Sequence, residues 1–464
     1  MQYGLMKRLH LRKYNIRNGE LTELLKRDVH APLYFFILKA ASLAFGNSIG
    51  VMKMVSVFPT ILMAIGGCLF LKKEFSDKAA LIFLLVLIAS ESITRYAIEI
   101  RMYSWALFFV TMMAVSAFYF FKTSQKRWWM ALLLCTAGAQ YTHTYAMVAA
   151  AIVYCLLLLY TLIYRKENRF AILLLGGVAS IFFLPWLIVV AKQFSHVSGN
   201  FWIEPLTLST ILGYMNIIFS TGYIFVNIVF FFLYCAVLVF FLARKNKTVD
   251  DHFLFGGLCC AVLLVSSGII LSIVVSPLFY DRYLIPVVGL VWLFFAAQCA
   301  AIPSKRIFIS LLVALSIMGF TSFLYSAQRE AEEHKESNIF YTHITQRLQQ
   351  DDVFVFDVSA SRSHLPFTIN SLLPNKISIP SDTTKIDTLA PSLFFSKRYS
   401  SSRIKWDPGI YNDRTVWTFL DGFDKDDTKY ENIVPSHLRG VFQGEFQYNF
   451  YRFRLYRSEP DSEL

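Results

Sequence analysis

Long apolar runs separated by short basic loops restrict the fold of this chain more than any other feature of its sequence. A helix needs about 20 apolar residues to cross a bilayer, and most of the runs approach or reach that length. The sequence therefore predicts a polytopic α-helical membrane domain. The runs lie at 31–46, 49–71, 79–97, 102–121, 128–140, 145–164, 170–191, 209–243, 253–275, 283–301 and 306–325.

Composition agrees with a membrane protein. The 464 residues are 56% hydrophobic and 16% charged, whereas about a quarter of a soluble domain is charged. The net charge of +12 could indicate nucleic acid, but many Lys and Arg residues stand in short loops between apolar runs, where they report topology. We expect membrane lipids and no nucleic acid among the partners. The seven cysteines lie in apolar runs without metal-ligand spacing, so we interpret them as small core residues.

Three runs differ in length from a single span. The run 31–46 is short and contains Lys39, which favours a re-entrant or interfacial segment. The run 128–140 is also short, and we expect its neighbours to extend it. The run 209–243 is long and contains Gly222, so it predicts an interfacial helix followed by a true span.

The basic loops define an orientation for a multi-pass protein of the cell (inner) membrane. By the positive-inside rule the short basic loops face the cytoplasm, and the loops that alternate with them face outward. This alternation holds from residue 72 to residue 306. The basic loops are Lys72-Lys73 with Lys78, Lys122 with Lys126-Arg127, Arg165-Lys166 with Arg169, Arg244-Lys245 with Lys247, and Lys305-Arg306.

The two ends of the chain differ from its apolar middle. Residues 1–30 interleave Lys and Arg with Leu, which is typical of an amphipathic segment on a membrane surface. After residue 326 the sequence is mixed, with strand patterns at 352–357 and 451–456 and a helix pattern at 328–349. The expected organisation is an interfacial segment (1–30), a multi-spanning domain of roughly ten helices (31–325), and a smaller α/β extracytoplasmic domain (326–464).

Ionisable residues gather at the helix ends predicted to face outward. Such a grouping indicates a site at the boundary between membrane and water. Each residue also has a structural interpretation: Glu99 and Arg101 can pair with each other, and Tyr283 can belong to an interfacial aromatic belt. Their common face favours a functional interpretation. The ionisable residues are Asp28, His30, Glu99, Arg101, His143, Lys192, His196, Glu204, Asp281 and Arg282.

Four short segments resemble motifs of bacterial GT-C glycosyltransferases, which are related to protein O-mannosyltransferases and to the lipid A aminoarabinose transferase. The stretch Asp28–Tyr34 (DVHAPLY) resembles their D-x-H-P-P-L-Y-Y segment. In the same order, Glu99–Tyr103 resembles E-x-R-M-Y, Tyr141–His143 resembles the helix-end Y-x-H, and Arg282–Pro286 resembles R-Y-L-x-P. The resemblance covers roughly residues 20–325 and implies a GT-C-like fold.

The resemblance implies transfer of a hexosyl or pentosyl group from a polyprenyl-phosphate-linked sugar to a glycan, lipid or protein acceptor on the outer face. An acceptor hydroxyl needs a carboxylate or His to remove its proton, and the leaving phosphate needs cations such as the Arg fork. No nucleotide-cofactor motif is apparent. The roles implied are catalysis for Asp28, Glu99 and His30, substrate binding for Arg101, His143, Lys192, Arg282 and Tyr283, and contact with a divalent metal ion for Asp28 and Glu99.

The sequence departs from the family pattern in two places, so two alternatives to the glycosyltransferase function are considered. Ala31 replaces the first Pro of the motif, and no Asp-Glu pair after a transmembrane helix precedes Asp28. One alternative is a transporter or flippase of a lipid-linked saccharide, which would line both halves of its path with polar groups. The other is a non-catalytic, truncated homologue whose outer domain binds the ligand.

Overall fold

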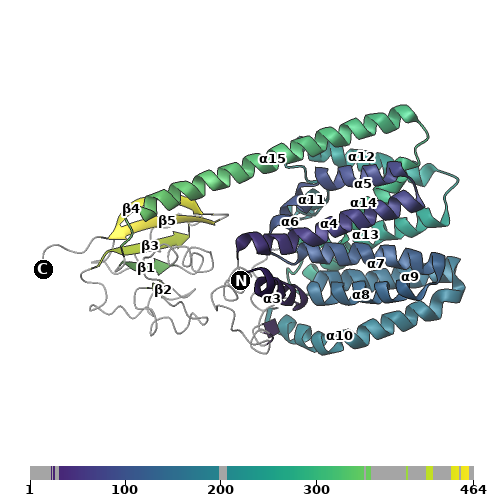
Figure 1. Ribbon diagram of the computed structural model, residues 1–464, viewed down its shortest axis with the longest axis horizontal. Coiled ribbons are helices and arrows are strands. Elements are labelled where there is room, and N and C mark those ends of the chain that lie inside the picture. The colour runs from purple at the N-terminus through teal and green to yellow at the C-terminus, as the bar shows by residue number, and fades with distance from the viewer. Residues whose placement is uncertain are drawn as a thin grey trace. The chain divides into compact units, whose positions relative to one another are not determined.

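The structure is a computed structural model of the chain (Figure 1), and it describes residues 22, 25–26, 31–46, 48–197, 206–349, 352–356, 393–395, 414–421, 440–448 and 451–458. Two compact units divide the chain. One comprises Arg17–Ser326, and the other comprises Met1–Ile16 together with Ala327–Leu464.

The larger unit is helical, and its helices confirm the predicted membrane domain. Within the described part of the chain, eight helices are long and apolar enough to cross a membrane, or nine if α5 and α6 form one bent span. The helices are α3 (Leu33–Phe45), α4 (Ile49–Glu74), α5 (Asp77–Ala89), α6 (Glu91–Ile98), α7 (Tyr103–Thr123), α8 (Lys126–Thr142), α9 (Thr144–Tyr164), η1 (Lys166–Asn168), α10 (Arg169–Val197), α11 (Leu208–Phe219), α12 (Ile224–Ala243), α13 (Val249–Val274), η2 (Asp281–Leu284), α14 (Ile285–Ala300) and α15 (Lys305–Thr345).

Polar residues mark where several of these helices begin. Ser48, Ser76, Thr207 and Thr248 each accept a hydrogen bond from the backbone N–H three residues later. Such N-caps satisfy a backbone donor that the first helical turn leaves without a partner. Local sequence therefore explains the bounds of these helices.

The run 79–97 does not form the one continuous helix that the sequence had suggested. It is broken at Ser90 into α5 and α6, which are bent by 67°. The break allows the Glu91 N–H to donate to the Ser220 carbonyl at 2.8 Å and the Ser92 hydroxyl to donate to the Ile217 carbonyl at 2.6 Å. The first of these replaces the bond that the Glu91 N–H would make to the Leu87 carbonyl in a continuous helix. Both connect the break to residues near the end of α11.

The break predicted within 209–243 is present, between α11 and α12. Gly222 lies there with φ +92°, a conformation that favours glycine. The Asn227 side chain accepts hydrogen bonds from the Thr221 N–H at 2.6 Å and from its hydroxyl at 2.8 Å. In contrast, the patterns at 306–325 and 328–349 belong to one continuous helix, α15.

Helix α14 forms the centre of the larger unit. All its residues from Ile285 to Cys299 are buried, and it packs against α5, α7, α9, α12 and α13. A Cβ atom at Gly289 would overlap the Thr111 side chain, so glycine permits the close approach of α7 and α14. Because η2 leads directly into α14, this packing positions the residues of η2.

The described strands form a mixed five-stranded sheet in the order β2-β1-β3-β5-β4. β1 pairs in parallel with β2 and β3, whereas β3, β5 and β4 pair antiparallel. The alternation predicted near 451–456 is present, since Phe453 and Leu455 are buried while Arg452 is exposed. The strands are β1 (Val353–Phe356), β2 (Leu393–Phe395), β3 (Val416–Asp421), β4 (Val441–Tyr448) and β5 (Tyr451–Ser458).

Candidate active site

A chain of ring contacts joins four segments that lie far apart in the sequence. Tyr96 of α6 lies 5.1 Å from Tyr103 of α7, between ring centroids. Tyr103 lies 5.3 Å from His143, and His143 lies 5.4 Å from Tyr283. Three of the predicted outer loops therefore meet at one end of the helical unit. We call these four residues the aromatic cluster.

Arg282 is held beside this cluster. Its guanidinium lies 4.7 Å from the Tyr280 ring centroid and 6.0 Å from that of Tyr283. Its backbone N–H donates to the Asp281 carboxylate at 2.6 Å. A guanidinium stays charged under all ordinary conditions, and its planar fork fits a phosphate. The arrangement thus presents a permanent cation on aromatic faces.

A second charged group adjoins the other end of the cluster. The Glu99 carboxylate lies 3.5 Å from Arg95 Nε and 3.4 Å from Arg101 Nε. The Arg95 guanidinium in turn lies 5.8 Å from the Tyr96 ring centroid. The Glu99 side chain is only 12% exposed. The structure therefore contains the Glu99–Arg101 pair that the sequence analysis considered, with Arg95 as a further partner.

The start of α3 lies against the same region. The Tyr34 and Ser56 hydroxyl oxygens are 3.0 Å apart, and the Ser56 hydroxyl donates to the Arg101 carbonyl at 3.5 Å. Tyr34 is the last residue of the stretch that resembles D-x-H-P-P-L-Y-Y. The predicted site residues Asp28 and His30, and with them Glu204 and the side chain of His196, lie outside the described residues, and their roles stay predictions.

His143 has a structural task that limits its chemistry. It is 6% exposed and caps α9, with Nδ1 accepting a hydrogen bond from the Tyr145 N–H at 3.1 Å. An Nδ1 that accepts this bond carries no proton, so in the neutral ring the proton is on Nε2. His143 is therefore better suited to donate a hydrogen bond to a substrate oxygen than to remove a proton.

The structure places Glu99 beside Arg101, and it places His143, Tyr283 and Arg282 in or beside the aromatic cluster. The roles assigned to these residues stay predictions. Lys192, which the sequence analysis predicted to bind substrate, differs from them. It is an exposed residue on α10, and the contacts described above do not include it.

Several site residues escaped the sequence analysis. Tyr145 stacks on Tyr283 at 4.7 Å, and its hydroxyl donates to the Leu278 carbonyl at 2.9 Å. The Tyr214 hydroxyl donates to the Phe279 carbonyl at 3.1 Å. Burial raises the pKa of Tyr214 to about 12, so it remains a neutral donor at physiological pH. Tyr145 stands two residues after the Tyr141–His143 motif, and this position was a signal that could have identified it. Tyr214 lies far from every matched motif.

Of the two residues expected to contact a metal ion, Asp28 and Glu99, the structure describes only Glu99. Among the described residues, no three His, Cys, Asp or Glu side chains lie close enough together to hold a metal ion. Glu99 offers one carboxylate, which two guanidinium groups already contact, and Asp28 is outside the described set. A divalent ion bound by Asp28 and Glu99 stays a prediction.

Comparison with known proteins identifies the fold. No family model matches the chain, and no curated protein does. Among solved structures, ArnT from Cupriavidus metallidurans in the apo state has 13% sequence identity and a TM-score of 0.58, over 98% of this chain and 92% of ArnT. ArnT bound to undecaprenyl phosphate has 12% identity and a TM-score of 0.56, over 92% of this chain and 87% of ArnT.

This similarity confirms the GT-C-like fold that the four motifs predicted: a multi-pass helical membrane domain with a small mixed sheet in the C-terminal part. At this level of identity it establishes the fold and leaves the activity to be argued from the site.

Proposed function

We propose that the protein is a membrane glycosyltransferase that moves a sugar from a polyprenyl-phosphate donor to an acceptor on the outer face of the membrane. The observation that carries the proposal is the position of Arg282 on the tyrosine rings, at the same end of the helical unit as Glu99 and Arg101. One ArnT structure of the same fold is bound to undecaprenyl phosphate.

The residue types suit displacement of a phosphate from a sugar. The acceptor oxygen attacks the anomeric carbon, and the bond between that carbon and the phosphate oxygen breaks. The bonding electron pair leaves with the phosphate, which becomes polyprenyl phosphate. The proton of the acceptor passes to a base, for which Asp28 is the candidate.

The cationic side chains stabilise the leaving phosphate. Arg282 is the first candidate for this contact because its guanidinium is half-buried and supported by rings. Glu99 holds Arg95 and Arg101 in place through its ion pairs. His143, with its proton on Nε2, is the candidate for a hydrogen bond to a sugar or acceptor oxygen. The sugar is a hexose or a pentose, and the acceptor a glycan, lipid or protein.

The centre of the helical unit favours an enzyme over a transporter. A transport path for a saccharide needs polar groups along its length. From Ile285 to Cys299, buried α14 has Gln298 as its one polar side chain apart from the indole of Trp292, and Gln298 donates to Asp251 at 2.9 Å. Helix α14 therefore offers little polar lining for such a path.

The test measures transfer from radiolabelled undecaprenyl-phosphate-linked sugars, one hexose and one pentose, in membranes supplied with a cell-envelope acceptor extract. Asp28→Asn should reduce the rate by about 10²–10⁴ because it removes the base. Arg282→Gln should raise the KM for the donor. Arg306→Gln, which removes a cation from a basic loop, is the control and should transfer normally.

Each alternative has its own outcome. If Asp28→Asn transfers sugar as fast as wild type, the role of Asp28 is wrong. If the wild type moves the donor between leaflets without forming a new glycoside, the protein is a transporter. If it binds the donor without either change, it is a non-catalytic binding protein.

A further inference from the structure

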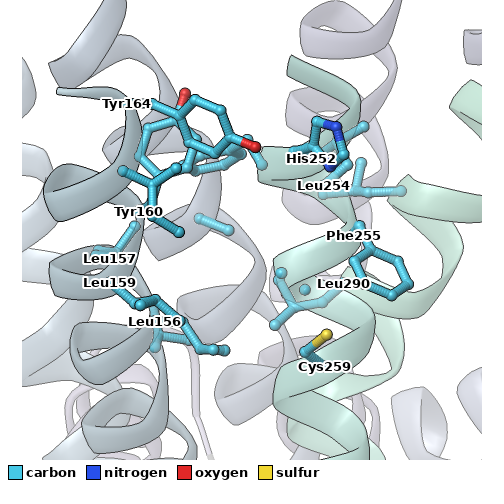
Figure 2. Close-up of a pocket in the computed structure, with 17 residues that line it drawn as sticks. Leu156, Leu157, Leu159, Tyr160, Tyr164, His252, Leu254, Phe255, Cys259 and Leu290 are labelled. Carbon is cyan, nitrogen blue, oxygen red and sulfur yellow. The ribbon is translucent and has the colours of Figure 1, made fainter. Parts of the chain in front are cut away.

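A cavity lies between α9 and α13, and residues of α14 also line it (Figure 2). Its volume is about 270 Å³. Leu156 and Tyr160 of α9 lie across it from Cys259 of α13, and Phe255 of α13 and Leu290 of α14 also line it. We call this cavity the α9–α13 groove. Its lining is mostly apolar.

The groove adjoins a surface suited to lipid. Leu159, Ile163 and Tyr164, which also line it, are 53%, 58% and 39% exposed. Both α9 and α13 are candidate membrane spans, so apolar side chains exposed on them would face hydrocarbon. An acyl chain therefore matches the lining better than water, which would find few hydrogen-bond partners there.

One end of the groove is polar. The rings of Tyr164 and His252 stack with centroids 5.9 Å apart, and both residues line the groove. Arg165, the C-cap of α9, interacts with the Tyr160 hydroxyl. An imidazole, a guanidinium and two phenol groups thus gather where α9 ends and α13 begins.

The loops at this end add positive charge. Residues 165–169 contain three basic residues and one acid, and residues 244–251 contain three basic residues and two acids. One of those acids, Asp251, pairs with Arg244 and also accepts hydrogen bonds from Thr248 and Gln298. The other, Asp250, interacts with Arg165 and Tyr160. The two loops together still hold six basic residues against three acids, and the positive-inside rule predicts that this end faces the cytoplasmic leaflet. Basic pockets between helices on that side suit anionic lipid head groups.

We infer that the α9–α13 groove binds an anionic glycerophospholipid, with one acyl chain in the groove and the phosphate beside Arg165 and His252. This site is distinct from the candidate active site. His143 and Tyr164 are at opposite ends of α9, which at 1.5 Å per residue places them about 30 Å apart. The inference does not depend on the proposed function, and its test needs no activity measurement.

Glycines offer a matched pair of variants for the test. A Cβ added at Gly256, which lines the groove, would meet nothing within 4 Å, and the same holds for Gly177 on α10. Leucine is a better helix former than glycine, so both Gly256→Leu and Gly177→Leu should fold. Only Gly256→Leu places a side chain in the groove.

The full chain, purified in detergent, is titrated with phosphatidylglycerol or with phosphatidylcholine of the same acyl chains, and bound lipid is counted by native mass spectrometry. Wild type should bind one phosphatidylglycerol in preference to phosphatidylcholine. Gly256→Leu should weaken this binding about tenfold or more, because it displaces methylene groups from the groove. Gly177→Leu should bind as wild type does.

Charge variants test the head-group contact. Arg165→Gln should reduce the preference for phosphatidylglycerol about fivefold, the effect of one basic residue near a lipid surface. Arg306→Gln, in another basic loop, should leave the preference unchanged. Equal binding of both phospholipids, or binding that Gly256→Leu leaves intact, would overturn the inference. Displacement of phosphatidylglycerol by a lower concentration of undecaprenyl phosphate would also overturn it.

Discussion

At the scale of single residues, the candidate site depends on side chains that combine a structural contact with a chemical one. Arg282 rests on the rings of Tyr280 and Tyr283, and Glu99 holds two guanidinium groups. His143 caps α9 through Nδ1 while its ring joins Tyr103 to Tyr283. A substitution at His143 therefore needs a design that separates these two tasks.

We predict different effects of His143→Asn and His143→Ala on stability but the same effect on activity. Both remove the ring and its Nε2 donor, so both should slow sugar transfer by about a hundredfold. Asparagine can still cap the helix, so His143→Ala should be less stable than His143→Asn by about 1 kcal/mol. Thermal unfolding in detergent and the transfer assay measure the two effects. Activity restored in His143→Asn would show that the ring matters only as a cap.

At the scale of elements, the turn between α11 and α12 is attached to the break between α5 and α6. The Glu91 N–H donates to the Ser220 carbonyl, and the Ser220 hydroxyl donates to the Glu91 carboxylate at 3.3 Å. Asn227 stabilises the turn through Thr221, which is fully buried. This attachment brings α6, and with it Tyr96, to a defined position at the site.

Asn227→Ala should lower the free energy of unfolding by about 1–3 kcal/mol, because it leaves the buried Thr221 N–H without its acceptor. Ser180→Ala is the control. The Ser180 hydroxyl donates to a carbonyl of its own helix on an exposed face, so its loss should change stability little. Thermal unfolding of both variants in one detergent provides the measurement. Equal stability of Asn227→Ala and wild type would show that the turn does not need this side chain.

At the scale of the whole helical unit, internal contacts sort the loops into two groups. The aromatic cluster joins the loops near residues 99, 143 and 282. Other contacts join the basic loops to one another. The loops at the two ends are therefore the same two sets that alternate along the sequence, one set basic and the other not. Two residues separate α7 from α8, and one residue separates α8 from α9. Because these connections are so short, α8 must run from one end of the unit to the other. The contacts between basic ends are those of Lys122 with Glu74, Lys78 with Phe308, and Tyr164 with His252.

The positive-inside rule predicts the direction of the unit in the membrane, and single-cysteine labelling tests this prediction. Positions in the basic loops should be protected from an impermeant reagent in intact cells, and positions between α10 and α11 and in the C-terminal part should react. Labelling of the C-terminal position only after permeabilisation would contradict the proposed outer site. The protected positions are Lys73, Lys126, Lys166, Lys247 and Lys305, and the reactive ones are Ser198 and Ser381.

The sequence by itself determined the membrane-spanning character and most helix bounds, because each helix must satisfy its own backbone and bury its own apolar run. It also predicted strands β1 and β5, whose patterns are local. Only the tertiary structure decided that Tyr96, Tyr103, His143 and Tyr283 meet, since such contacts depend on how distant helices pack. The sequence did not predict the helix break at Ser90 either. The residues that follow it, Glu91 and Ser92, form hydrogen bonds with residues more than a hundred positions away in the sequence.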